Sequence, residues 1–283
     1  MAITHISDTA RWVATYRAME TERPDAIFRD PFAARLAGEQ GRQIVETMPR
    51  GRQSAWAMIT RTAVFDEIIL DLVRGGGVDL VVNLAAGLDA RPWRLDVPAT
   101  LRWVDVDLPD ILRYKTDELK NERTRCKYEA IYADLREAGA RQALMSQLGA
   151  SASRALIVTE GLLVYLTADQ VNALATDLHA QPSFRWWLFD LASPRLLAML
   201  NKQWGDRLQR GNSPMQFGPA EGTKFFEKSG WRESQFRSQL EEARRLNREM
   251  PLMWLWRFIS RLSPAAKREE FRRMAGIVLL ERA

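Results

Sequence analysis

Three acidic side chains follow three separate apolar runs, each at or just beyond the point where the run ends. Asp107 follows residues 101–106, Asp134 follows residues 128–132, and Glu160 follows residues 155–159. Because the carboxyl ends of parallel strands meet at one edge of a sheet, we expect these carboxylates to lie close together. A carboxylate can accept both hydrogen bonds of a vicinal diol, so the pattern favours a ribose site.

A turn of small residues comes before these acids. The apolar run 78–84 ends at Ala85-Ala86-Gly87, which predicts a buried strand followed by backbone that a ligand can approach. Asp107 follows Gly87 by about 20 residues, the spacing at which an acid meets ribose in dinucleotide-binding folds. The alternative is that each acid only caps the helix after its strand. Three acids in register favour the ribose site.

The turn lacks the glycine pattern of a dinucleotide site. Its sequence is A-A-G-L-D-A rather than G-x-G-x-x-G, and Asp89 is poorly placed against a phosphate. A nucleoside cofactor without phosphate fits better. We therefore predict S-adenosylmethionine.

A parallel sheet is needed to position these residues. Strands are expected at 78–84, 101–106, 128–132, 155–159 and 184–191, with helices at 109–121, 140–148 and 167–180 between them. Repeated strand–helix units predict a parallel sheet with right-handed crossovers. Two further strands, at 231–236 and 276–281, give an α/β fold with a mostly parallel seven-stranded sheet and helices on both faces.

Helical segments are expected before and after this core. Helices at 8–22, from Asp30-Pro31 onward, and at 54–74 precede the first strand and could cover a ligand. Helices at 195–211 and 221–228 follow the core. No repeat or linker divides the chain, so we expect one domain: an N-terminal helical cap (1–77), a cofactor-binding core (78–191) and a C-terminal part with lid, substrate elements and final strands (192–283).

Composition excludes several function classes. The chain has 283 residues, 46% of them hydrophobic, and a net charge of +5. One cysteine (Cys126) and two histidines (His5 and His179) rule out a disulfide framework and argue against a metal site, so none is predicted. Without a membrane-length apolar run or a signal-peptide pattern, we expect a soluble, cytoplasmic protein.

Eight sequence pieces occur in the order found in a known family: DTARWVATYRAME, FRDPFAARL, TRTAVFDEII, VVNLAAGLDARPWRL, WVDVDLPDILRYK, ADLRE, TEGLLVYLT and GIVLLERA. The chain thus resembles the leucine carboxyl methyltransferase family, in its branch of bacterial small-molecule O-methyltransferases. The resemblance implies the Rossmann-like fold of class I S-adenosylmethionine-dependent methyltransferases. It weakens between residues 193 and 271, where substrate-recognising parts would lie.

The resemblance also implies cofactor contacts. Arg61 matches an arginine that holds the cofactor carboxylate, which suits the fork of a guanidinium. Asp107 matches the ribose-binding acid. Asp134 and Leu135 match the pair beside the adenine, and Glu160 matches an acid near the methionine moiety.

One position departs from the family pattern G-A-G-x-D. Ala85 stands where the first glycine would be, whereas Gly87 is kept. We expect the extra methyl group to narrow the cofactor cleft or tilt the strand end, with binding tolerated.

The scarcity of histidine favours a particular acceptor. A carboxylate is already ionised at neutral pH, whereas a phenol or alcohol needs a general base. We therefore expect methylation of a small-molecule carboxylate, with Tyr165 hydrogen-bonded to the acceptor or, alternatively, a core tyrosine. Other hypotheses are a phenol or hydroxyl O-methyltransferase and a cofactor-binding protein without turnover.

Two interactions with macromolecules are not expected. A nucleic-acid methyltransferase would carry [ND]-P-P-[YF] where this chain has TEGLLVY, so no nucleic-acid partner is predicted. Residues 250–273 combine apolar residues at helical spacing with basic residues, and we favour a lid or core packing over membrane contact. The oligomeric state is not predicted.

Overall fold

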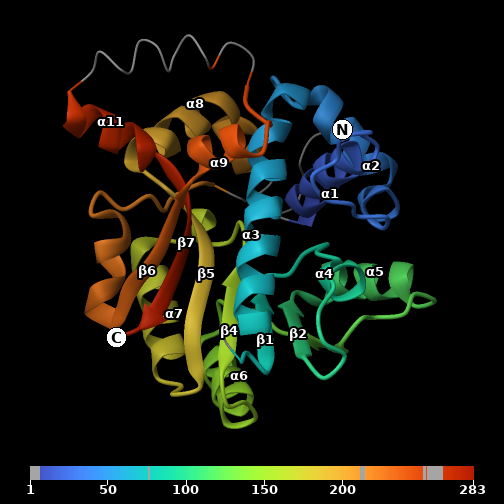
Figure 1. Cartoon of the computed structure of the whole chain (residues 1–283), viewed down its shortest axis with the longest axis vertical. Coiled ribbons are helices and arrows are strands. Elements are labelled where there is room, and N and C mark those ends of the chain that lie inside the picture. Colours follow the sequence, from blue (N-terminus) through green and yellow to red (C-terminus); the bar gives the residue numbers. More distant parts are fainter. Residues whose placement is uncertain (1–6, 76, 211–213, 251–252, 254–263) are drawn as a thin grey trace.

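The computed structural model describes residues 7–75, 77–210, 214–250, 253 and 264–283 (Figure 1). Its sheet has seven strands in the order β3-β2-β1-β4-β5-β7-β6. They are β1 (Leu80–Leu84), β2 (Arg102–Asp107), β3 (Lys127–Tyr132), β4 (Ala155–Thr159), β5 (Phe184–Ala192), β6 (Trp231–Ser238) and β7 (Ala275–Arg282). Strands β1 to β5 pair in parallel, and β7 is antiparallel to both neighbours. The predicted mostly parallel sheet is confirmed.

Helices cover both faces of the sheet. Helix α3 (Ala55–Gly75) crosses one face, while α6 (Ala138–Ala150) and α7 (Ala168–His179) lie on the other (Figure 1). Successive β1 residues point to opposite faces, so Val81 packs with Phe65 of α3, whereas Val82 packs in the cluster that contains Leu174 of α7. The strand is buried along its whole length, as its continuous apolar sequence predicts.

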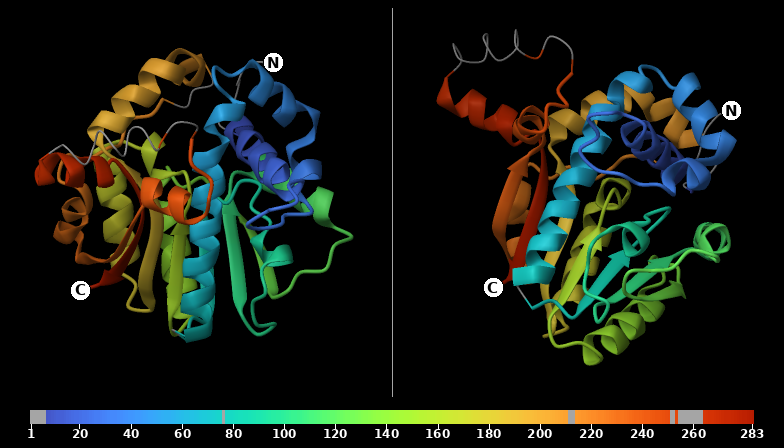
Figure 2. Two further views of the ribbon diagram at one scale, coloured as in Figure 1. Left: turned by 45° about the horizontal axis from the view of Figure 1, so that its top comes forward. Right: turned by 45° about the vertical axis from the view of Figure 1, so that its right-hand side comes forward.

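A helical layer lies beyond the carboxyl ends of the parallel strands (Figure 2). It contains α1 (Ser7–Thr21), α2 (Ala33–Thr47) and α8 (Pro194–Arg210). Trp12 of α1 and Trp204 of α8 pack edge to face, with ring centroids 5.0 Å apart, in a cluster with Tyr16 and Ile44. Segments almost 200 residues apart in the sequence thus form one cover over the strand ends.

The remaining elements are short. They are η1 (Arg52–Ser54), α4 (Arg91–Arg94), α5 (Pro109–Leu119), η2 (Leu163–Tyr165), η3 (Gly222–Ser229), α9 (Gln239–Arg245) and α11 (Ala265–Arg272). Among the described helices, none combines the length and the hydropathy that a membrane-spanning segment requires.

Several predicted helix positions need correction. Pro31 precedes α2 instead of opening it, because the N-cap is Phe32. The helix predicted at 221–228 is a 3₁₀ helix, and neither α4 nor α9 was predicted. Residues 212–213 and most of the tryptophan-rich segment 250–263 lie outside the described residues, so the lid hypothesis for that segment stays untested.

Candidate active site

A cavity of about 1070 Å³ lies between the strand ends and the helical layer. It is lined by all eight residues predicted to form the site, namely Arg61, Ala85, Gly87, Asp107, Asp134, Leu135, Glu160 and Tyr165. A site for one drug-sized ligand spans roughly 300–1,000 Å³, so this cavity has room for a cofactor and an acceptor together. The structure brings these residues to one place, while their individual roles stay predictions.

Strand register explains why the acids converge. Leu84 of β1 is the partner of Val106 in β2, so the turn at Ala85 lies next to Asp107. Thr159 of β4 pairs with Phe189 of β5, which sets Glu160 beside Asp190. We call the cavity-lining residues at these strand ends, together with their ion-pair partners, the floor.

Asp107 is held by backbone amides. Its Oδ2 accepts a hydrogen bond from Gly87 N at 2.6 Å, and its Oδ1 accepts one from Leu108 N at 2.7 Å. Burial raises the pKa of the Asp107 carboxyl, although both amide bonds oppose that shift. Each oxygen keeps a second lone pair, so the oriented carboxylate can still accept hydrogen bonds from a ribose diol.

Arg91 is the centre of the floor and is only 2% exposed. Its Nε donates to Asp66 Oδ1 at 2.6 Å, and its Nη1 donates to Asp89 Oδ2 at 2.8 Å and to Glu160 Oε2 at 2.7 Å. Burial acts to raise the pKa of Asp89, but the charge of Arg91 outweighs it and the pKa falls to about 2. The group is therefore fully ionised at neutral pH.

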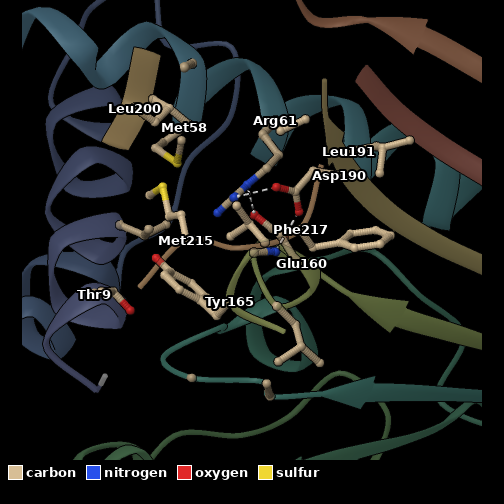
Figure 3. Close-up of a pocket in the computed structure, with 18 of the residues that line it drawn as sticks. Thr9, Met58, Arg61, Glu160, Tyr165, Asp190, Leu191, Leu200, Met215 and Phe217 are labelled. Carbon is tan, nitrogen blue, oxygen red and sulfur yellow. Dashed lines mark hydrogen bonds and ion pairs between the residues drawn. The ribbon is translucent and has the colours of Figure 1, made fainter. Parts of the chain in front are cut away.

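Glu160 also contacts the second arginine of the site (Figure 3). Arg61 Nε donates to Glu160 Oε1 at 3.0 Å, and Arg61 Nη1 donates to Asp190 Oδ2 at 3.1 Å. Burial acts to raise the pKa of Glu160, but Arg91 and Arg61 together lower it. The two residues predicted to hold the amino-acid end of the cofactor thus contact each other directly.

Tyr165 and Asp134 also line the cavity. Tyr165, in η2, is half-buried and lies near Thr9 (Figure 3), and burial raises the pKa of its phenol. Asp134 pairs with Arg136 at 2.6 Å. That hydrogen-bonded arginine lowers the pKa of Asp134. Tyr165 lines the cavity, as the acceptor-binding hypothesis requires.

The floor is built for a ligand without phosphate. The helix after β1 is the single turn α4, and Asp89 Oδ1 accepts a hydrogen bond from Arg91 N at its start, 2.9 Å away. A carboxylate therefore occupies the place where a phosphate would bind. The ion-pair network joins four arginines to five carboxylates: Arg17, Arg61, Arg91 and Arg94, with Asp30, Asp66, Asp89, Glu160 and Asp190. This excess of negative charge suits a sulfonium cation.

Sequence comparison decides the family. Residues 10–179 match the leucine carboxyl methyltransferase family. The chain belongs to this family. A relative from Parafrankia sp. (strain EAN1pec), described as a candidate S-adenosyl-L-methionine-dependent methyltransferase, is 37% identical over 183 residues, or 61% of this chain and 58% of the relative. A relative from Streptomyces coelicolor, described in the same way, is 36% identical over 187 residues, which cover 61% of this chain and 64% of the relative. The match spans about six-tenths of these relatives.

Solved structures support the fold assignment. A candidate methyltransferase from Thermobifida fusca YX has a TM-score of 0.58 at 13% identity, covering 95% of this chain and 94% of that one. A DUF574 family protein from Streptomyces avermitilis MA-4680 has a TM-score of 0.56 at 12% identity, covering 95% and 97%. The predicted class I methyltransferase fold is confirmed. The family and the descriptions of these relatives agree with the predicted enzyme class and with S-adenosylmethionine as its cofactor.

Ala85 departs from the usual leucine carboxyl methyltransferase pattern at a demanding position. Its φ is 55°, in the left-handed region that glycine adopts without penalty. We expected the methyl group to narrow the cleft or tilt the strand end. The β1–β2 pairing stays regular up to Leu84, so the strand end is not tilted, whereas narrowing of the cleft stays a prediction. The left-handed conformation itself implies backbone strain of roughly 1–2 kcal/mol.

Sequence reasoning missed several members of the floor. Asp66 and Asp190 lie within an apolar helix and an apolar strand, and Arg91 is part of the piece VVNLAAGLDARPWRL with no role predicted for it. Asp190 is the only acid of its strand, and such an acid inside a buried element is a usable signal, because an unpaired buried charge is costly. Which arginine it would pair with is not visible in the sequence.

Proposed function

We propose that this protein transfers the methyl group of S-adenosylmethionine to a carboxylate of a small molecule. The observation that carries the proposal is the hydroxyl of Tyr165 beside Arg61, in a cavity whose described lining contains no histidine. Arg61 and Tyr165 flank the same part of the cavity (Figure 3). Among the described lining residues there is no histidine, and His179 packs against Trp231 elsewhere.

Two acids of the cavity, Glu160 and Asp89, are weak candidates for a general base. Glu160 is paired with two arginines that lower its pKa, and Asp89 has a pKa of about 2. Burial keeps the phenol of Tyr165 protonated, so it can donate a hydrogen bond at neutral pH. A phenol or alcohol acceptor would have to lose a proton, whereas a carboxylate acceptor would not.

The floor residues fit the proposed cofactor by their chemistry. Asp107 would accept hydrogen bonds from the ribose, Asp134 and Leu135 would border the adenine, and Arg61 with Glu160 would hold the amino-acid end. When bound, S-adenosylmethionine supplies an electrophilic methyl group, and the protein must place an acceptor oxygen about 3 Å from it, in line with the sulfur.

The first test is binding. Calorimetric titration of the full chain with S-adenosylmethionine, with NADH in parallel, should give binding of the first only. NADH binding would contradict the absence of a phosphate site. Binding without any product in an acceptor screen would favour the cofactor-binding protein without turnover.

The second test identifies the acceptor group. With methyl-labelled cofactor and a panel of carboxylic acids and phenols, we expect a base-labile methyl ester. The rate should be flat with pH above the acceptor's own pKa, from about pH 6 to about pH 8. A base-stable ether, formed at a rate that rises towards the phenol pKa of about 10, would show a hydroxyl acceptor instead.

A further inference from the structure

The side of the cavity opposite the floor is rich in methionine. Six of the chain's ten methionines line this cavity: Met58, Met199, Met215, Met250, Met253 and Met274. They are joined by Trp12, Leu196, Leu200 and Trp204. We call these residues the roof. Such a concentration of flexible thioether side chains is typical of surfaces that adapt to apolar ligands.

The roof begins where the charged groups end (Figure 3). Met58 of α3, Leu200 of α8 and Met215 converge on one side of the cavity, next to Arg61 and Tyr165. These three side chains offer no hydrogen bond, so each hydroxyl group buried against them without another partner would cost about 1–3 kcal/mol. An alkyl chain would gain contacts with every one of these side chains.

The apolar lining continues to the protein surface. Met199 is 53% exposed and Met250 is 38% exposed, and both line the cavity. In the described part of the chain, the only other large hydrophobic residue of comparable exposure is Tyr132. An apolar path from the reacting groups to solvent lets the chain of a ligand extend outward.

We propose that the acceptor is a long-chain aliphatic monocarboxylic acid, an inference that rests on the proposed carboxyl methylation. Its carboxylate accepts a hydrogen bond from the Tyr165 hydroxyl, beside the Arg61 that holds the cofactor, and its alkyl chain runs along the roof towards Met199. A carboxylate oxygen bonds to the methyl carbon of S-adenosylmethionine while the carbon–sulfur bond breaks. The bonding electrons stay on sulfur, so the products are a methyl ester and a neutral thioether, and no proton moves.

The length of the alkyl chain of the acceptor tests this inference most directly. Initial rates with butanoic, octanoic and dodecanoic acids should show kcat/KM rising about fourfold for each methylene group that becomes buried. A flat or falling dependence on length, with butanoic acid methylated, would overturn the inference and leave the proposed function standing.

A binding experiment separates the two proposals. The same acids are titrated calorimetrically into the protein saturated with S-adenosylhomocysteine. If no acid is methylated but affinity rises with chain length, the roof binds alkyl chains and carboxyl methylation fails. If affinity does not rise with length, the inference fails irrespective of activity.

A variant at an exposed position localises the effect. Met199→Glu places a charge on the apolar path, and Ala198→Glu places the same charge one residue away on α8, at an exposed position that does not line the cavity. We expect Met199→Glu to raise KM for dodecanoic acid about tenfold, with Ala198→Glu within about twofold of the wild type. Equal effects in both variants would place the alkyl chain elsewhere and overturn the inference.

Discussion

The floor and the roof face each other across one cavity and are built on opposite principles. In the floor, buried arginines and carboxylates hold one another at 2.6–3.1 Å, so each group is fixed by several partners. In the roof, methionine and leucine side chains pack without directional bonds. The floor suits a ligand that must be held in one orientation, and the roof suits a ligand whose shape varies.

The two regions also differ in their relation to the family. The floor comes largely from residues 61–160, within the matched stretch 10–179. Much of the roof comes from α8, residues 214–217 and residues near 250 and 274, beyond that stretch. The proposed cofactor site thus lies within the part of the chain that matches the family, whereas much of the proposed acceptor site lies outside it.

The largest expected effect is removal of the central cation of the floor. Arg91→Ala leaves Asp66, Asp89 and Glu160 without their common partner in a buried site, so the free energy of unfolding should fall by about 3–5 kcal/mol. Urea denaturation measures it. The control is Arg74→Ala, which removes an exposed pair with Asp96 and should cost less than about 1 kcal/mol. Similar losses in both variants would contradict the assigned importance of the network.

The sequence predicted the floor's acids better than their partners, for a physical reason. Asp107 and Glu160 follow apolar runs, and a run ending in a turn is a local signal. Ion pairing is not local, since Arg61 and Asp190 are 129 residues apart. The seven strands were predicted within about two residues, and for buried strands such as β1 and β4 the reason is the same, because burial leaves continuous apolar runs.

The roof was not predicted as a unit at all. Met58 and Met215 belong to elements that are separate in sequence, and an apolar residue on a helix has the same pattern whether it faces a core or a cavity. The only signal available in the sequence was that the chain contains ten methionines. Only the fold shows that six of them converge.

A second test of the floor concerns cofactor affinity. Asp107→Ala removes the carboxylate proposed to accept the ribose hydrogen bonds, so the binding free energy of S-adenosylmethionine should weaken by about 1–3 kcal/mol. Calorimetry measures it. Asp110→Ala, at an exposed position in the first turn of α5 outside the cavity, should leave affinity unchanged. Unchanged affinity in Asp107→Ala would reject the ribose assignment.

Ala85, the strained residue of the floor, offers a substitution that should stabilise the protein. Ala85→Gly relieves the left-handed conformation at φ 55° and should raise the free energy of unfolding by about 1 kcal/mol. Gly87→Ala is the reverse experiment, because φ is 50° there and the new Cβ would lie 3.1 Å from the Cβ of Ala10. Thermal and urea denaturation should therefore move in opposite directions for the two variants. A destabilised Ala85→Gly would mean that the methyl group contributes packing that outweighs the strain.

The smallest expected effect tests whether the roof really differs from the floor. Met215→Leu keeps side-chain volume and apolar character, so the free energy of unfolding should change by less than about 1.5 kcal/mol and the affinity for S-adenosylmethionine should not change. Leucine is branched and stiffer than methionine, so the range of acceptors should narrow even though stability does not suffer. Relative kcat/KM across the acid panel measures this. A change in cofactor affinity comparable to that of Asp107→Ala would show that floor and roof form one rigid site, and the division of labour between them would have to be abandoned.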